Sequence, residues 1–113
     1  MKIVISPAKS LNFEKALPTS DFSDSLFLKE SRQVHKVLKQ KSPKDLSELM
    51  DISDKLADLN WQRNQDWKTP FTPENARPAV FAFDGDVYTG LNAYSIPIEK
   101  LAVLQDRLRI LSG

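Results

Sequence analysis

Residues 42–59 read SPKDLSELMDISDKLADL, and this stretch contains the clearest helix signals in the chain. Ser42 is a preferred N-cap residue, Pro43 suits the first helical position, and Asp45 stands where a capping carboxylate reaches back. A second helix start follows at Ser53, and leucines recur at helical spacing after each start. We therefore predict two short helices joined by a tight turn.

The two helices are similar to a helix-hairpin-helix element, which we place near residues 43–60. In that motif, amide groups at the start of the second helix face a phosphate, because they lack intrahelical partners and the helix dipole adds positive charge. The expected DNA-binding residues are Lys39, Lys44, Ser53 and Lys55. Asp51 and Ser53 stand where the motif favours glycine, and Asp51 would repel a phosphate. A plain helical corner of the core is the alternative interpretation.

A longer helix is predicted upstream, from Ser23 or Asp24 to about Gln40. Residues 29–45 contain six lysines and arginines against two acidic residues, which favours an anionic partner. A solvated helix face has the same composition. The net charge of the whole chain is only +1, which argues against strong DNA binding. His35, the single histidine of the chain, is expected to be solvated.

Short apolar runs lie on both sides of these helices. We predict strands near residues 2–6, 79–84 and 108–112, the last one after a helix that opens at Pro97. The expected fold class is α+β, helix-rich with a small mixed sheet. With 113 residues, 41% of them hydrophobic and 27% charged, the chain fits a single domain over 1–113. Its strand-like ending suggests the amino-terminal part of a longer domain.

Composition excludes several classes of protein. The chain has no cysteine, so thiol catalysis, cysteine-ligated zinc and iron–sulfur clusters within it are excluded. The apolar runs are too short to cross a bilayer or to form a secretory signal peptide. We expect a cytoplasmic protein with no membrane partner, no cofactor and no obligate protein partner.

Two polar segments follow predicted strands. Ser6 and Lys9 form a candidate anion site, since anions often bind beyond the carboxyl ends of strands. Asp84 and Asp86 are candidate ligands for a metal ion of unknown identity. The sequence favours the alternative interpretation of each segment as an exposed turn. If Lys9, Asp84 and Asp86 converge, the protein is instead an enzyme or a small-molecule binder for a phosphate-bearing ligand.

Five segments carry a family resemblance. In chain order they are ISPAK at 5–9, LMDISDKLA at 49–57, FTPENARPA at 71–79, FDGDVYTGL at 83–91 and RILSG at 109–113. Together they resemble the YaaA family of bacterial peroxide-stress proteins. Members of that family are more than twice as long, so the resemblance covers their amino-terminal part only.

The resemblance implies a cytosolic protein of the response to hydrogen peroxide that limits damage from free intracellular iron. It also implies non-specific binding of duplex DNA through a helix-hairpin-helix-like element, which falls on Leu46 to Leu59 here. The residues favour a binding protein over an enzyme, and we assign no catalytic residue. With no cysteine and one histidine, no conventional iron site is visible.

Overall fold

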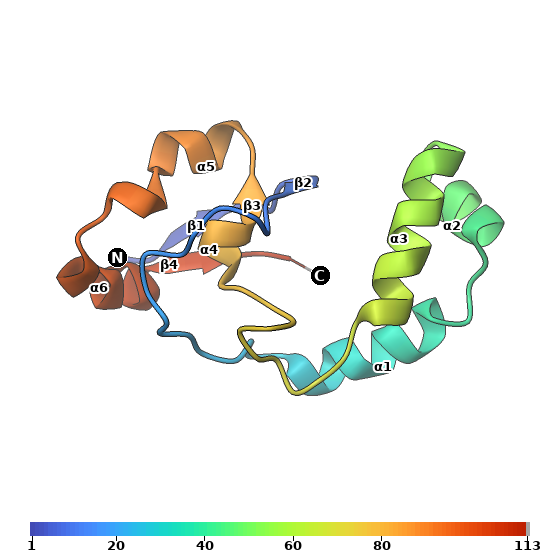
Figure 1. The fold of residues 1–113 in the computed structure, drawn as a ribbon, viewed down its shortest axis with the longest axis horizontal. Helices are drawn as coiled ribbons and strands as arrows, with labels where there is room; N and C mark the ends of the chain where they lie inside the picture. The colour runs from blue at the N-terminus through green and yellow to red at the C-terminus, as the bar shows by residue number, and fades with distance from the viewer. Residues whose placement is uncertain (113) are drawn as a thin grey trace. The chain divides into compact units, whose positions relative to one another are not determined.

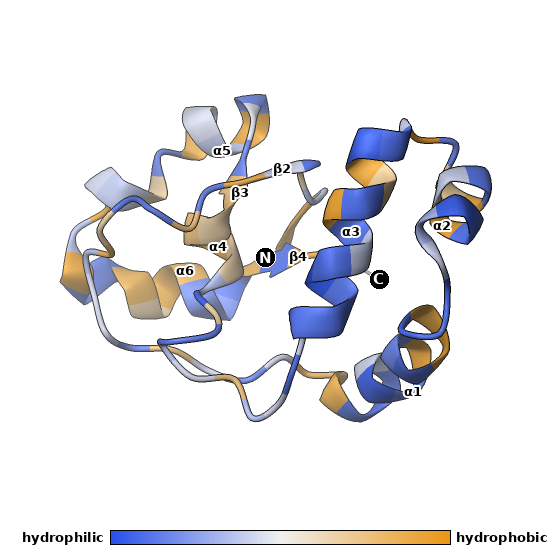
Figure 2. Cartoon of the chain, turned by 45° about the vertical axis from the view of Figure 1, so that its right-hand side comes forward, coloured by the Kyte–Doolittle hydropathy of each residue, from blue (hydrophilic) through white to orange (hydrophobic). Residues whose placement is uncertain are grey.

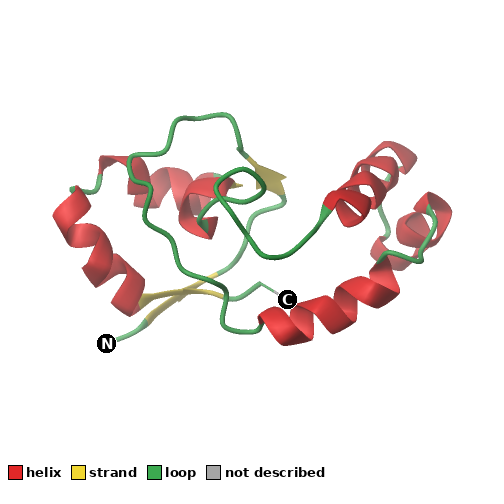
Figure 3. Ribbon diagram, turned by 60° about the horizontal axis from the view of Figure 1, so that its bottom comes forward, coloured by secondary structure: helices red, strands yellow, loops and turns green. Residues whose placement is uncertain are grey.

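The computed structural model describes residues 1–112, and it confirms the helix-rich α+β class. Its elements, in chain order, are β1 (Ile3–Ile5), β2 (Ser10–Leu11), α1 (Leu28–Leu38), α2 (Pro43–Met50), α3 (Asp54–Asp66), α4 (Ala79–Ala82), β3 (Phe83–Asp84), α5 (Asp86–Leu91), α6 (Leu101–Arg107) and β4 (Leu108–Ile110). Two short 3-10 turns, Ala93–Ser95 and Ile98–Lys100, lie between α5 and α6. Figure 3 shows how little of the chain is strand.

The chain divides into two compact units (Figure 1). The helical unit, Asp24–Phe71, contains α1, α2 and α3. The sheet unit combines Met1–Ser23 with Thr72–Gly113 and contains all four strands and the remaining helices. Each candidate site lies within one unit, so each can be described separately.

In the helical unit, α2 and α3 pack against each other through two buried side chains. Leu46 is fully buried and Ala57 is 1% exposed, so a small residue on α3 lets the two helices approach closely. Most residues of α3 are hydrophilic (Figure 2). Both helices begin where the sequence predicted, at the caps Ser42 and Ser53.

Side-chain hydrogen bonds and one ring contact tie α1 to the end of α3 and the segment after it. His35 Nε2 lies 2.7 Å from the carbonyl oxygen of Asn64, and its ring centre is 4.3 Å from that of Trp67. Arg32 Nε donates to Thr69 Oγ1 at 3.0 Å. Two expectations are therefore wrong: His35 is half-buried rather than solvated, and α1 begins at Leu28 rather than at Ser23 or Asp24.

In the sheet unit, the strands form two pairs. β1 and β4 run parallel, with Ile3 opposite Leu108 and Ile5 opposite Ile110, which confirms the first and last predicted strands. β2 and β3 run antiparallel, with Ser10 opposite Asp84. The core of this unit consists of Phe81, Ala82, Tyr88 and Ala93.

The predicted strand at residues 79–84 requires a correction. Ala79–Ala82 forms one turn of helix, α4, and only Phe83–Asp84 is strand. The amide of Ala82 donates to the carbonyl oxygen of Pro78 at 3.1 Å, as in a helix. A short apolar run cannot distinguish a buried helical turn from a buried strand, because every position is apolar in both.

Among residues 1–112, no helix combines the length and the apolar character needed to span a membrane.

Candidate functional site

The start of α2 is held by a reciprocal pair of hydrogen bonds. The hydroxyl of Ser42 accepts from the amide of Asp45 at 3.1 Å, and the Asp45 carboxylate accepts from the amide of Ser42 at 2.9 Å. The hydrogen bond from the Ser42 backbone, followed by one from the Ser42 side chain, holds the pKa of the Asp45 carboxyl below its usual value, with help from Lys41 and Lys44. The predicted capping box is thus present, and it fixes where Lys44 leaves the backbone.

The turn between α2 and α3 is fastened from within. Asp51 adopts a left-handed conformation, with φ 50° and ψ 54°, at a position where glycine is usual. The amides of Asp51 and Ile52 both donate to the carbonyl oxygen of Ser47, and the Ser47 hydroxyl donates to the Ile52 carbonyl at 2.8 Å. The amides of Asp51 and Ile52 therefore have partners, and they are not free for a ligand.

The start of α3 remains open. The Ser53 hydroxyl accepts from the amide of Leu56 at 3.3 Å, which leaves the amides of Asp54 and Lys55 without an intrahelical partner. Ser53, Asp54 and Lys55 are all exposed. Of the amides predicted to face an anion, those of Asp54 and Lys55, the first two residues of α3, therefore remain available.

Lys44 lies close to this start. A hollow of about 410 Å³ between α2 and α3 is lined by Lys44 together with Pro43, Asp54, Ala57 and Asp58. The structure therefore brings Lys44 beside the first turns of α3, but it also brings two carboxylates there. Lys2 and Asp106 form the one ion pair found within residues 1–112, so Lys44 and Lys55 have no carboxylate within 4.0 Å.

Lys39, the fourth predicted DNA-binding residue, lies elsewhere on the unit. Its carbonyl oxygen accepts a hydrogen bond from the side chain of Gln65, near the carboxyl end of α3. With a rise of about 1.5 Å per residue, this end lies roughly 18 Å along the helix from Ser53. Lys39 therefore does not share a single phosphate with Ser53 and Lys55.

The candidate anion and metal residues of the sheet unit come from two segments in contact. The Tyr88 hydroxyl donates to the carbonyl oxygen of Ser6 at 2.7 Å, and a Cβ added at Gly85 would lie 3.4 Å from that of Ala8. Lys9 precedes β2, Asp84 lies in β3 and Asp86 begins α5. Within the described part of the chain, no three histidine, aspartate or glutamate side chains gather as metal ligands do.

A second hollow, of about 320 Å³, borders Asp84 but neither Lys9 nor Asp86. Its rim contains polar residues that the sequence did not indicate, namely Asn12, Lys15, Thr89 and Asn92. They were missed because their proximity depends on contacts between distant segments. The single local signal is Asn92, since asparagine tolerates the left-handed conformation it adopts at the end of α5.

The chain matches known proteins along its whole length. A family model described as "Peroxide stress protein YaaA" matches residues 1–113. The chain belongs to this family. A UPF0246 protein of Flavobacterium johnsoniae is 80% identical over the whole chain, and one of Flavobacterium psychrophilum is 63% identical. A UPF0246 protein of Neisseria meningitidis is 48% identical.

The chain spans less than half the length of these relatives. The match covers 100% of this chain but 45% of the two Flavobacterium proteins and 44% of the Neisseria protein. The family therefore connects the chain to peroxide stress.

Proposed function

We propose that this protein acts in the response to peroxide by binding the backbone of duplex DNA through its helical unit, and that it limits damage from free intracellular iron. Membership of the peroxide-stress family supports the cellular role. The open start of α3 supports the DNA-binding role. The iron-related role rests on the family resemblance alone.

The free amides of Asp54 and Lys55 are the observation that carries the DNA-binding proposal. They lie at the positive end of the α3 dipole, where a phosphate oxygen is a suitable acceptor. The Ser53 hydroxyl uses only its oxygen to cap the helix, so its proton is available to the same phosphate. The result is a three-donor site on exposed residues.

Lysines supply the charge that the amides lack. Lys55 projects from the first turn of α3, and Lys44 borders the hollow beside it. Lys39, farther along the unit, is placed to meet a different phosphate. Contacts to phosphates position a protein without reading bases, so this surface is expected to bind duplexes of any sequence.

Salt dependence tests the proposal directly. If about three phosphates are neutralised, log affinity falls with log salt at a slope near −2.7. Fluorescence anisotropy with the intact protein and two duplexes of unrelated sequence measures this slope. The triple variant Lys39→Gln, Lys44→Gln and Lys55→Gln should bind both duplexes more weakly, with a slope closer to zero.

A charge-matched variant controls for net charge. The changes Lys2→Gln, Lys9→Gln and Lys100→Gln remove the same charge from the sheet unit and should leave most of the affinity intact. Circular dichroism confirms that both variants remain folded. Wild-type affinity in the helical-unit variant, or equal losses in both variants, would refute the proposed surface.

The iron-related role is tested in cells. A bacterial strain that lacks the intact protein should contain more chelatable iron after exposure to hydrogen peroxide than its parent, and the wild-type gene should restore the parental level. The triple-lysine variant then separates the two roles. If it restores iron control without binding DNA, the two roles are independent. Unchanged iron in the deletion strain would refute the iron-related role.

A further inference from the structure

The 320 Å³ hollow in the sheet unit has the size of a site for a small ligand, since ligand pockets begin at about 300 Å³. It is formed by the loop after β2, by α4 and β3, and by α5 with the turn that follows. Its lining residues are Asn12, Lys15, Val80, Phe81, Phe83, Asp84, Tyr88, Thr89, Asn92, Ala93 and Tyr94. All of them belong to the sheet unit.

The surface that lines the hollow is mainly polar, and a smaller part of it is apolar. Phe81, Tyr88 and Ala93 lie beneath this surface and are at most 7% exposed. Both tyrosine hydroxyls of the lining already donate hydrogen bonds, Tyr88 to the Ser6 carbonyl and Tyr94 to the Phe81 carbonyl, each at 2.7 Å. These two hydroxyls therefore have no proton left to donate to a ligand, and a ligand takes its hydrogen bonds from the polar residues of the rim.

One side of the rim carries a cation in a fixed loop. The Asn12 amide donates to the Ala82 carbonyl at 2.7 Å, and the Asn12 side chain accepts from the amides of Glu14 and Lys15. The guanidinium of Arg77 donates to the carbonyl oxygens of both Asn12 and Lys15. The Lys15 ammonium is then held 4.1 Å from the ring centre of Tyr94.

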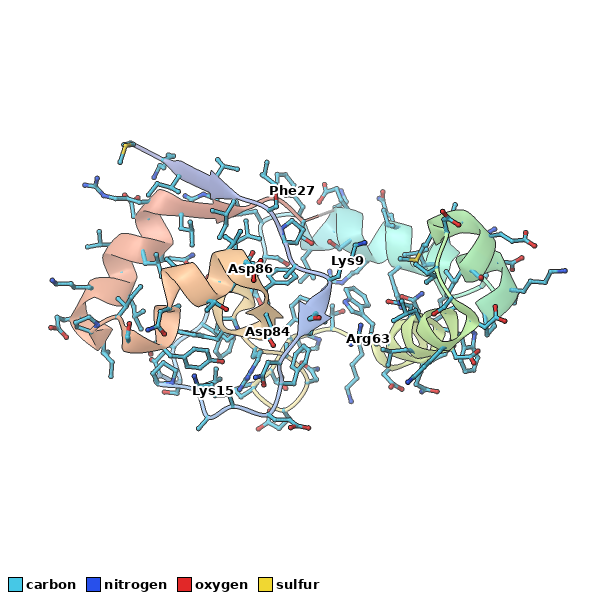
Figure 4. The ribbon with its side chains drawn as sticks, turned by 90° about the horizontal axis from the view of Figure 1, so that it is seen from above. Lys9, Lys15, Phe27, Arg63, Asp84 and Asp86 are labelled. Atoms are coloured by element: carbon cyan, nitrogen blue, oxygen red, sulfur yellow. The ribbon has the colours of Figure 1, made fainter. Side chains whose placement is uncertain are left out.

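The other charge on the rim is a carboxylate. Asp84 lies in β3, opposite Ser10 of β2, and its side chain is exposed. Figure 4 shows Lys15 and Asp84 as separate side chains from different segments of the unit. Neither forms an ion pair with any residue among 1–112, so their charged groups are more than 4.0 Å apart.

We infer that this hollow binds a small zwitterion of the α-amino-acid class. The ligand carboxylate meets Lys15, and the ligand ammonium meets Asp84. A ligand that carries only negative charge would be repelled by Asp84, and one that carries only positive charge would be repelled by Lys15. The uncharged rim groups of Asn12, Thr89 and Asn92 supply hydrogen bonds without changing this balance.

The test is binding of free amino acids to the intact protein. Thermal shift with each of the standard L-amino acids identifies those that stabilise it, and calorimetric titration measures their affinities. At least one amino acid should bind, whereas its decarboxylated amine and its deaminated acid should bind at least about tenfold more weakly. Lys15→Met and Asp84→Asn should each weaken amino-acid binding by at least about tenfold.

Matched variants make the result specific. Lys100→Met and Glu99→Gln remove the same charges from exposed residues that do not line the hollow, and they should leave the affinity unchanged. Lys15→Arg should restore most of the binding lost in Lys15→Met. The inference is overturned if no amino acid binds the folded protein. It is also overturned if inorganic phosphate binds as well as any amino acid, or if Asp84→Asn leaves amino-acid affinity intact.

Discussion

The hydroxyl of Tyr88 donates a hydrogen bond of 2.7 Å to the carbonyl oxygen of Ser6, a residue 82 positions earlier in the chain. Tyr88 is 7% exposed, so this bond forms away from bulk water. It joins the segment after β1 to α5, the two segments that contain the residues Ser6, Lys9 and Asp86 singled out from the sequence.

Replacing this tyrosine should destabilise the protein without creating a large cavity. Tyr88→Phe removes the donor and leaves the Ser6 carbonyl without its partner, which should lower the free energy of unfolding by about 1–3 kcal/mol. Urea unfolding followed by circular dichroism measures the change. Val87→Ala, at the neighbouring exposed position, is the control and should alter stability by no more than about 0.5 kcal/mol. Equal stability of wild type and Tyr88→Phe would contradict the role of this bond.

Tyr88 should also make the free energy of unfolding depend on pH in the alkaline range. Burial raises the pKa of the Tyr88 phenol above its ordinary value of 10.0, because the phenolate would lose hydration in the folded state. A raised pKa stabilises the fold below pH 10.0, and this contribution is lost as the pH rises through the folded-state pKa. The difference in unfolding free energy between wild type and Tyr88→Phe should therefore shrink above pH 10. A constant difference across this range would show that Tyr88 ionises as freely as in the unfolded chain.

Two leucines of α2 provide a matched pair. Leu46 is fully buried against α3, whereas Leu49 is 66% exposed. Leu46→Ala should lower the free energy of unfolding by about 2–5 kcal/mol through lost burial and a cavity, and Leu49→Ala by no more than about 0.5 kcal/mol. Because α2 and α3 hold the proposed phosphate site, Leu46→Ala should also weaken DNA binding. Similar losses of stability in the two variants would show that α2 packs differently.

Removing an acidic side chain beside Lys44 should strengthen DNA binding rather than weaken it. Asp58 lines the same hollow as Lys44 and should repel an incoming phosphate. Asp58→Asn is therefore expected to strengthen duplex binding by roughly twofold at low salt, with the gain disappearing as salt is raised. Glu48→Gln, an exposed residue of α2 outside the hollow, controls for net charge. A gain in Glu48→Gln as large as that in Asp58→Asn would place the phosphate away from the hollow.

Local signals predicted much of the helical unit. Ser42 and Ser53 cap helices in the structure as the sequence indicated, because a cap depends on residues within three positions of it. The same reasoning did not anticipate the left-handed Asp51, since glycine or asparagine is the usual signal for that conformation. Of the predicted DNA-binding residues, Lys44, Ser53 and Lys55 lie on neighbouring turns, while Lys39 lies near the other end of α3.

The sequence by itself determined the strands Ile3–Ile5 and Leu108–Ile110 and the caps of α2 and α3. Each of these features depends on residues that are neighbours in the chain. Only the tertiary structure decided that Ala79–Ala82 is helical and that Lys15 and Asp84 border one hollow. The Arg77 guanidinium helps to hold Lys15 at the hollow by donating hydrogen bonds to the carbonyl oxygens of Asn12 and Lys15, more than 60 residues earlier in the chain. Contacts across such separations form only when the whole core closes, and no local pattern of residues specifies them.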